Sequence, residues 1–197
     1  MEKYVVTISR QFASMGRTIA QQMSETLGIR FYDRDIVDET AKRTGQTVSE
    51  VSSIEEQGAS PFSNHRYPLD LGLLSLHKQI FEVQSNIIRD LASKESCIIV
   101  GRCADSVLKD FPRCLNIYIY APKEERLKNC VERLSMDPKK AKDTLVFMDR
   151  ARELYRARFA GTKDAMEHQH LMIDSSHFGP EATAQILCTV VRQVFDT

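Results

Sequence analysis

The chain has 197 residues, enough for one domain with a sizeable buried core, and its hydrophobic content of 42% is ordinary for a soluble globular protein. Its 27 basic and 27 acidic residues give a formal net charge of zero, which argues against nucleic acid or an anionic membrane as a partner. No apolar run approaches the ~20 residues of a membrane span, and the first residues lack a signal-peptide pattern, so we expect a cytoplasmic protein.

Short apolar runs alternate with longer stretches of helical periodicity, which predicts one α/β domain over residues 1–197 with a parallel sheet and crossover helices. The expected strands, in chain order, are Tyr4–Ile8, Ile29–Tyr32, Cys97–Val100, Leu115–Tyr120 and His170–Ile173. A first helix is expected through Ile19, Met23 and Leu27, and Gly28 supplies its stop. Further helices are expected at residues 35–43, 69–94 and 180–195.

Two stretches interrupt this alternation. Residues 45–68 are polar and carry Pro and Gly, so we expect part of this stretch to be a mobile loop. Residues 123–159 predict two helices dense in Lys and Arg, with a break near Pro138. Asp137 is expected to cap the second of these helices.

The segment between the first strand and the first helix has the context of a phosphate-binding loop. A helix N-terminus offers unpaired N–H groups and a positive dipole end to an anion. Gly16 permits close backbone approach, Arg17 adds a permanent charge, and the Thr18 hydroxyl stands where a Mg²⁺ ligand is expected. The residues expected to bind ATP phosphates are Ala13, Ser14, Met15, Gly16, Arg17 and Thr18.

This loop departs from the strict GxxxxGK[ST] pattern at two positions. Gln11 stands at the first glycine position and Arg17 at the lysine position. On the pattern alone, an ordinary strand–turn–helix connection with a surface arginine is an open alternative.

The chain resembles the cytidylate-kinase-like family, a branch of the P-loop nucleoside monophosphate kinases. The resemblance rests on Ile8–Phe12, Gly16–Arg17, Leu27–Ile29, Phe31–Asp33, Val100–Asp105 and the segment Asp149–Arg152 with Tyr155 and Gly161. It implies a three-layer α/β/α P-loop kinase fold with a five-stranded parallel sheet. The implied reaction transfers the γ-phosphoryl group of ATP, bound with Mg²⁺, to a nucleoside monophosphate. CMP or dCMP is the expected acceptor. The resemblance also implies an acceptor-binding insertion at 45–94 and a lid at 134–165.

Three residues are candidates for binding the acceptor. Arg102 follows the third strand at the carboxyl edge of the sheet, and it resembles the arginine that holds the acceptor phosphate in cytidylate kinases. Asp105 lies two residues later than a base-reading aspartate of the family, and an acid that stabilises a helix N-terminus is an equal alternative. Arg34, after the second strand, is a candidate against a solvated surface arginine.

Arg150, Arg152 and Arg156 are the candidate catalytic arginines of the lid, together with Arg17 of the loop. Phosphoryl transfer favours such a cluster because its transition state spreads negative charge over the phosphate oxygens. Positions 152 and 156 share one helix face. A solvated basic helix is the alternative for each single arginine.

Two further functions stay open at this point. Acceptor choice would lie in residues 45–94, where the resemblance is weakest, so a kinase for another small acceptor is one of them. The other is a nucleotide-binding regulatory protein with weak or lost catalysis, which Arg17 and the absent loop glycines at Ala13 and Met15 would explain.

Overall fold

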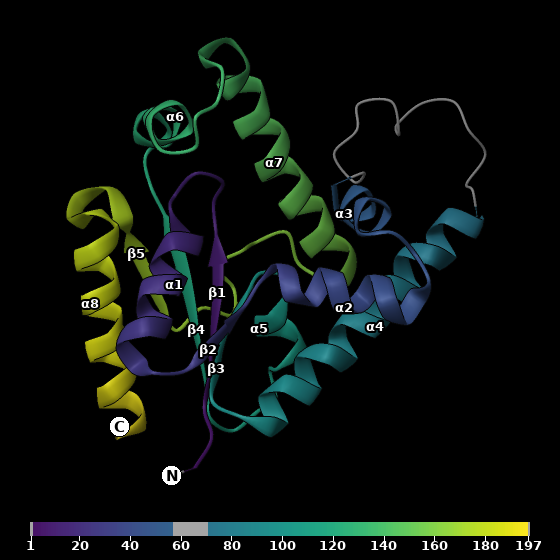
Figure 1. Ribbon diagram of the computed structural model, residues 1–197, viewed down its shortest axis with the longest axis horizontal. Helices are drawn as coiled ribbons and strands as arrows, with labels where there is room; N and C mark the ends of the chain where they lie inside the picture. The colour runs from purple at the N-terminus through teal and green to yellow at the C-terminus, as the bar shows by residue number, and fades with distance from the viewer. Residues whose placement is uncertain (1, 57–70, 197) are drawn as a thin grey trace.

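The computed structural model describes residues 2–56 and 71–196, and it has the α/β fold that the sequence predicts (Figure 1). Five parallel strands form one sheet in the order β2-β3-β1-β4-β5. The strands are β1 (Val5–Arg10), β2 (Arg30–Tyr32), β3 (Cys97–Val100), β4 (Cys114–Tyr120) and β5 (Leu171–Asp174). The described helices are α1 (Gly16–Leu27), α2 (Arg34–Thr44), α3 (Val48–Glu56), α4 (Leu71–Lys94), α5 (Ala104–Val107), α6 (Lys123–Glu132), α7 (Pro138–Phe159) and α8 (Ser175–Phe195).

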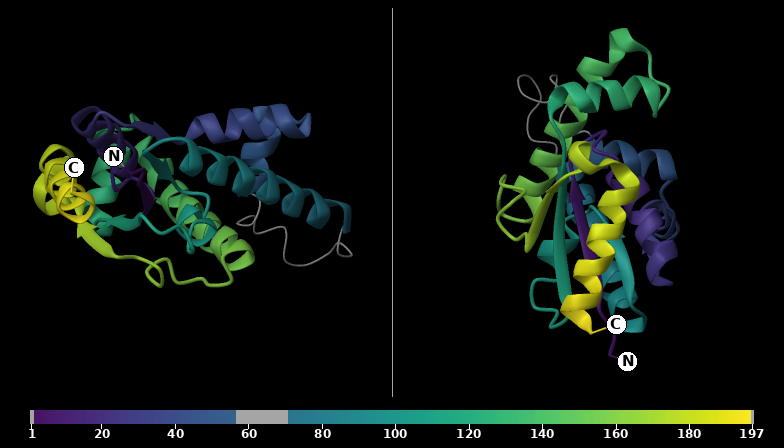
Figure 2. Two further views of the ribbon diagram at one scale, coloured as in Figure 1. Left: turned by 90° about the horizontal axis from the view of Figure 1, so that it is seen from below. Right: turned by 90° about the vertical axis from the view of Figure 1, so that its left-hand side faces the viewer.

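The central strand β1 is apolar along most of its length because helices cover both of its faces. Val6 and Ile8 belong to the cluster that α1 and α8 complete, and α8 runs beside α1 (Figure 2). Val5 belongs to the opposite cluster, which contains residues of α2, α4 and α5. A strand buried in this way needs apolar side chains pointing in both directions, which explains its β-branched composition.

The register of the sheet brings the ends of three strands to one edge. Ile8 pairs with Val100 of β3 and with Ile117 of β4, and β1 continues two residues further to Arg10. The parallel order therefore places the β1–α1 loop, the residues after β3 and the residues after β2 at the same carboxyl edge, where open α/β sheets bind ligands.

The polar stretch that was expected to be a mobile loop contains a helix. Residues 48–56 form α3, which packs against α2 and α7. Thr47 and Glu50 form a capping box at its start: the Thr47 N–H donates to Glu50 Oε2 at 2.7 Å, and the Glu50 N–H donates to Thr47 Oγ1 at 3.2 Å. This capping box stabilises the start of α3. The sequence pattern did not indicate the helix because the glycine and proline residues later in the same stretch favoured a loop. The remaining expected loop residues, 57–68, lie outside the described part of the chain.

The other boundaries follow the sequence with small shifts. Asp137 caps α7, where its carboxylate accepts from the Lys139 N–H at 2.8 Å. The last helix begins at Ser175 instead of Pro180, because Asp174 caps it, and Gly179 with φ 74° interrupts the helical geometry just before the proline. Within the described residues, no helix is long and apolar enough to cross a membrane.

Candidate phosphate and acceptor site

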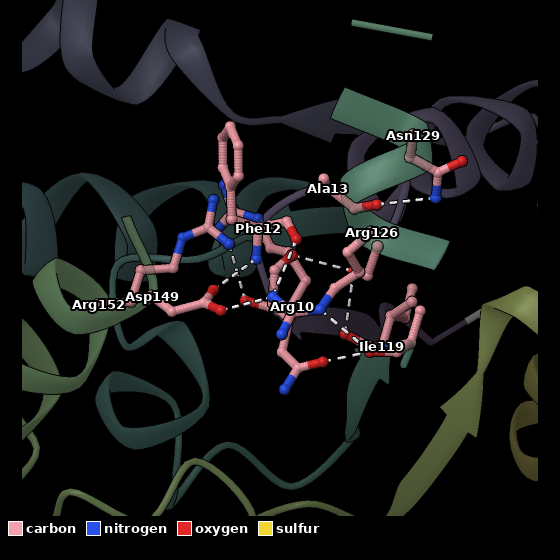
Figure 3. A network of polar contacts seen from close by, with 11 residues as sticks. Arg10, Phe12, Ala13, Ile119, Arg126, Asn129, Asp149 and Arg152 are labelled. Atoms are coloured by element: carbon pink, nitrogen blue, oxygen red, sulfur yellow. Dashed lines mark hydrogen bonds and ion pairs between the residues drawn. The ribbon is translucent and has the colours of Figure 1, made fainter. Parts of the chain in front are cut away.

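The loop between β1 and α1 is held from behind by side chains of α6 and by Asp149 of α7 (Figure 3). Arg126 Nη1 donates to the Phe12 carbonyl at 3.3 Å, and Asn129 Nδ2 donates to the Ala13 carbonyl at 3.0 Å. The Phe12 N–H donates to Asp149 Oδ1 at 2.8 Å, and Asp149 also pairs with Arg126. These contacts bind two loop carbonyls to α6 and one loop N–H to α7.

The N-terminus of α1 has no side-chain cap. Met15 occupies the N-cap position, offers no side-chain oxygen, and forms no capping hydrogen bond. The first helical hydrogen bond is from the Ile19 N–H to the Met15 carbonyl at 3.0 Å. The N–H groups of Gly16, Arg17 and Thr18 therefore lack intrahelical partners, and they present a positive dipole end to an anion.

The loop keeps a left-handed backbone at two positions that are not glycine. Ala13 has φ 58° and Met15 has φ 60°, a conformation that costs an L-residue roughly 1–2 kcal/mol. Each side chain is packed in return. Ala13 lies in a cluster with Cys130 of α6 and Leu145 of α7, and Met15 packs on the sheet core beside α1. The loop therefore adopts a backbone conformation typical of glycine, while the side chains of Ala13 and Met15 pack against α6, α7 and the sheet core.

Asp33 gathers three arginines at the carboxyl edge of the sheet. Its Oδ1 lies 2.9 Å from Arg102 Nη1 and 3.6 Å from Arg10 Nη2, and its Oδ2 lies 3.3 Å from Arg17 Nε. Although Asp33 stands at the N-cap of α2, its carboxylate makes no capping bond there. The Asp33 carboxylate therefore pairs with the arginines, and it links the candidate phosphate loop with Arg102, which follows β3.

Arg10 reaches this position because Gly101 has no side chain. A Cβ at Gly101 would lie 2.1 Å from Arg10 Nη1, and Gly101 also has φ 80°. The sequence thus requires glycine here for both space and backbone conformation. Gly16 is required in a similar way, since a Cβ there would lie 2.9 Å from the Cβ of Arg10.

The positive charges outnumber the carboxylates that compensate them. Burial, followed by repulsion from Arg152, lowers the pKa of Arg10 to about 9, and burial also lowers the pKa of Arg152. Burial would raise the pKa of Asp33, but the charges of Arg10 and Arg102 outweigh it and lower this pKa. With a pKa of about 9, Arg10 stays charged at neutral pH, and a bound anion would offset both the burial of this charge and its repulsion from Arg152.

A cavity of about 240 Å³ opens beside these arginines. Its lining includes Arg10, Glu55, Gly101, Arg102, Tyr118, Met148, Asp149, Arg152 and Tyr155. Met148, Arg152 and Tyr155 come from one face of α7, as their spacing of four and three residues requires. A second hollow, of about 340 Å³, lies on the other side of the α1 N-terminus, between Thr18, Gln22, Arg133 and the first part of α8 around residues 178–182.

The family model of the cytidylate kinase-like family matches residues 5–177. The chain belongs to this family. No curated protein matches it significantly. Its fold is that of the P-loop kinases.

Three solved structures illustrate that fold. An uncharacterised protein from Eubacterium ventriosum is 23% identical, with a TM-score of 0.72, and the match covers 96% of this chain and 98% of that chain. A shikimate kinase from Bacteroides thetaiotaomicron is 11% identical, with a TM-score of 0.59 and coverage of 98% and 99%. A shikimate kinase from Acinetobacter baumannii is 16% identical, with a TM-score of 0.54 and coverage of 97% and 94%. Family and fold together support a kinase-like, nucleotide-binding protein.

This member of the cytidylate kinase-like family brings Arg17, Arg102 and Arg152 together, whereas Arg156, which also lines the cavity, is bound to Asp105. Arg156 Nη1 and Nη2 lie 3.1 and 2.6 Å from the two oxygens of Asp105, and both side chains are buried. Arg156 Nε also donates to the Asp164 carbonyl at 3.0 Å. The arginine expected in the lid and the aspartate expected at the acceptor thus bind each other.

The remaining predicted residues lie outside the cluster. Arg150 is exposed on α7 and pairs with Glu153 at 3.0 Å. Arg34 is exposed at the first turn of α2. Ser14 is fully buried, and the carbonyls of Gln11 and Ile119, at 3.0 and 3.1 Å, are both within reach of its single O–H donor. The Ser14 side chain therefore braces the loop against β4.

Sequence reasoning missed several functional candidates that the structure places at this edge. Arg10 and Asp33 stand in the segments that carry the family resemblance, so their position after β1 and β2 was a usable signal. Asp149 of α7 and Arg126 of α6 form hydrogen bonds with the β1–α1 loop. Nothing in the sequence around either residue indicates that it contacts this loop. Glu55 had none, because it lies in a stretch that read as a polar loop.

Proposed function

We propose that this protein transfers the γ-phosphoryl group of MgATP to a nucleoside monophosphate, with CMP and dCMP as the first acceptors to test. One observation carries the proposal: the uncapped N-terminus of α1 follows a loop whose first residues, Ser9 to Gln11, line a cavity in which Arg10 and Arg152 lack sufficient counter-charge. Both features favour phosphate, and they lie at the same edge of the sheet.

The triphosphate of ATP would lie against the N-terminus of α1. The N–H groups of Gly16, Arg17 and Thr18 and the side chain of Arg17 are its ligands in this proposal. The hollow beside Thr18 and Gln22, closed by Arg133 and residues 178–182, offers a place for the base. This arrangement leaves the γ-phosphate nearest to the arginine cluster.

The residues present fit a Mg²⁺ ion that arrives with ATP. Thr18 is in the first turn of α1, and its hydroxyl has no hydrogen bond to any described residue. No group of three or more His, Cys, Asp or Glu side chains able to hold a metal occurs in residues 2–56 and 71–196, which agrees with an ion held mainly by phosphate oxygens and water. When bound, Mg²⁺ would neutralise charge on the phosphate oxygens.

The acceptor phosphate would lie in the cavity, bound by Arg10, Arg102 and Arg152. In the reaction, an oxygen of this phosphate forms a bond to the γ-phosphorus, the bond from the γ-phosphorus to the β–γ bridging oxygen breaks, and ADP leaves. The arginines contribute position and charge, which are the main requirements of phosphoryl transfer.

The lid is proposed to be residues 134–165, with Arg150 as one of its exposed cations. The half of α7 near Phe159 is anchored, because Phe159 stacks on Phe81 of α4 with ring centroids 4.4 Å apart. Arg150 lies before this anchored part, and its partner Glu153 is half exposed. A phosphate can therefore compete with Glu153 for Arg150.

A substrate panel tests this function. Thermal stabilisation by ATP would be measured with Mg²⁺ and with CMP, dCMP, UMP, AMP, GMP or a non-nucleotide acceptor, followed by coupled detection of ADP. We expect ATP stabilisation and ADP release with a cytidine monophosphate. Turnover with a different acceptor alone would reassign the substrate, and binding of ATP without any turnover would support a regulatory nucleotide-binding protein. Arg89→Ala, an exposed change on α4, is the matched control for arginine substitutions at the site.

A further inference from the structure

A buried chain of hydrogen bonds connects three helices to one wall of the cavity. The Tyr155 hydroxyl of α7 donates to Gln84 Oε1 of α4 at 2.7 Å. Gln84 Nε2 then donates to Glu55 Oε1 of α3 at 2.7 Å. Gln84 is fully buried, so both ends of its amide depend on these two partners.

The direction of this chain follows from the chemistry of its members. A carboxylate only accepts hydrogen bonds, so Gln84 must turn its NH₂ toward Glu55. Its carbonyl oxygen then faces Tyr155, which must donate. Burial, and then the charge of Glu55, raise the pKa of Tyr155 well above its ordinary value, which keeps the phenol protonated for this role. The chain therefore fixes Glu55 as an acceptor.

Glu55 faces the cavity with one oxygen still available. Its Oε1 takes the Gln84 bond and lies 3.3 Å from Arg102 Nε, an ion pair that lacks hydrogen-bond geometry. Its Oε2 makes no hydrogen bond to any residue within 2–56 and 71–196. The same cavity is lined by the cations Arg10, Arg102 and Arg152. The cavity thus combines cations that can bind an anionic group with one rigidly held hydrogen-bond acceptor, the Glu55 carboxylate.

We propose that Glu55 is a specificity-determining residue that accepts a hydrogen bond from an uncharged donor of the acceptor substrate, a hydroxyl or an amino group. The inference rests on the proposed function, since it describes the acceptor whose anionic group the arginines bind. A donor at this place pairs with Glu55 Oε2, whereas an analogue without it leaves a desolvated carboxylate oxygen unpaired. In a nucleotide, the donor is a ribose hydroxyl or the exocyclic amino group of the base.

Equilibrium binding tests the inference without requiring turnover. Dissociation constants would be measured by calorimetry for CMP against its 2′,3′-dideoxy analogue, and for CMP against UMP. The first pair tests a ribose hydroxyl and the second tests the amino group. We expect the wild type to prefer CMP by about 10-fold or more in one of the two pairs.

Glu55→Gln should abolish this preference. Gln84 would hold the oxygen of the new amide, so its NH₂ would face the cavity and meet the substrate donor with another donor. We expect the ratio in the sensitive pair to fall to about 1 or to invert, while the dissociation constant for ATP stays within about twofold.

Glu82→Gln is the matched control, because Glu82 is an exposed glutamate of α4 that pairs with Lys78 and lies outside both the cavity and the buried chain. It should leave the ratio unchanged. Tyr155→Phe keeps Glu55 and removes only the hydroxyl that donates to Gln84, so it should reduce the preference for CMP partly. This variant tests the same chain of hydrogen bonds in case Glu55→Gln impairs folding.

The outcomes separate this inference from the proposed function. A wild type that shows no preference in either pair, or a Glu55→Gln protein that keeps the preference, overturns the role of Glu55 even if CMP is phosphorylated. A preference that depends on Glu55 without any ADP release supports the inference about binding and contradicts the proposed kinase reaction.

Discussion

Arg152 and Arg156 lie one turn apart on α7, yet their surroundings differ completely. Arg156 makes two hydrogen bonds to a single buried carboxylate, Asp105, and a third to a backbone carbonyl. Arg152 donates to the Arg10 carbonyl at 3.0 Å and lies over the Phe12 ring, with no hydrogen bond to a carboxylate of the described residues. Both arginines line the cavity, but Arg156 is bonded to the protein through all three of its guanidinium nitrogens, whereas Arg152 lies there without a carboxylate hydrogen-bond partner.

The pKa values of the two guanidiniums move in opposite directions. Burial would lower the pKa of Arg156, but its hydrogen bonds and charge interaction with Asp105 outweigh burial and raise it. Burial lowers the pKa of Arg152, and the nearby carboxylates do not compensate for it. The comparison teaches that charge compensation, more than the density of arginines in sequence, separates an arginine that builds the fold from one that is available to a ligand.

The same substitution at both positions gives the largest expected difference. Arg156→Met leaves the charge of Asp105 buried without its cation, so we expect a loss of about 3–5 kcal/mol in unfolding free energy. Arg152→Met removes a charge that its surroundings disfavour, so we expect a loss below about 1 kcal/mol together with weaker acceptor binding. Denaturant unfolding and calorimetric binding measure the two effects. Equal destabilisation by both changes would remove the distinction.

Arg17→Ala tests the phosphate-loop side of the cluster. Its side chain is half exposed and pairs with Asp33, so stability should change by less than about 1 kcal/mol. The kcat for phosphoryl transfer should fall at least ~10²-fold, because a preorganised charge at the developing phosphate charge is lost. Steady-state kinetics beside Arg89→Ala measures this. Unchanged turnover would place Arg17 outside the catalytic site.

Arg102→Ala tests the acceptor side. Charge-assisted hydrogen bonds in a desolvated site are worth about 2 kcal/mol, which corresponds to roughly 30-fold in affinity. We expect the KM for the monophosphate to rise by about this factor and the KM for ATP to rise much less. A similar rise for both substrates would show that Arg102 acts through the shared partner Asp33 and not on the acceptor alone.

The sequence predicted the fold well because its signals were local. An apolar run such as Cys97–Val100 has few structural alternatives in a parallel sheet, and the turn before Gly16 indicated the junction of a strand and a helix that the structure has as β1 and α1. The helix α3 was missed because its capping box lies in a polar stretch, where turn-forming residues dominated the pattern.

The arrangement of the site could be predicted only in part, since the pairing of charges is a tertiary property. Asp105 and Arg156 are 51 positions apart, and nothing in either segment indicates that they form a bidentate pair. Likewise, Glu55 enters the cavity only because α3 packs between α2 and α7. Helix periodicity alone placed Arg152 and Arg156 on one face, but it did not distinguish their partners.

The smallest expected effect concerns the loop residue that replaces a glycine. Ala13→Gly would relieve the left-handed backbone of an L-residue, worth roughly 1 kcal/mol, and would remove one methyl group from the cluster with Cys130 and Leu145, worth a similar amount. The two terms oppose each other, so we expect the unfolding free energy to change by less than about 1 kcal/mol and ATP affinity to stay within about threefold.

Ala141→Gly is the matched control for Ala13→Gly. Ala141 belongs to the same cluster and is equally buried, but it lies in the helix α7 with no left-handed strain to relieve. Its replacement should therefore lose the methyl contact and add the helix penalty of glycine, about 1 kcal/mol, in the same direction. If denaturant unfolding showed equal losses for the two variants, Ala13 would carry no strain. Ala13 would then be an ordinary packing residue. Its presence in place of glycine would not be explained by packing against α6 and α7 in exchange for a strained backbone.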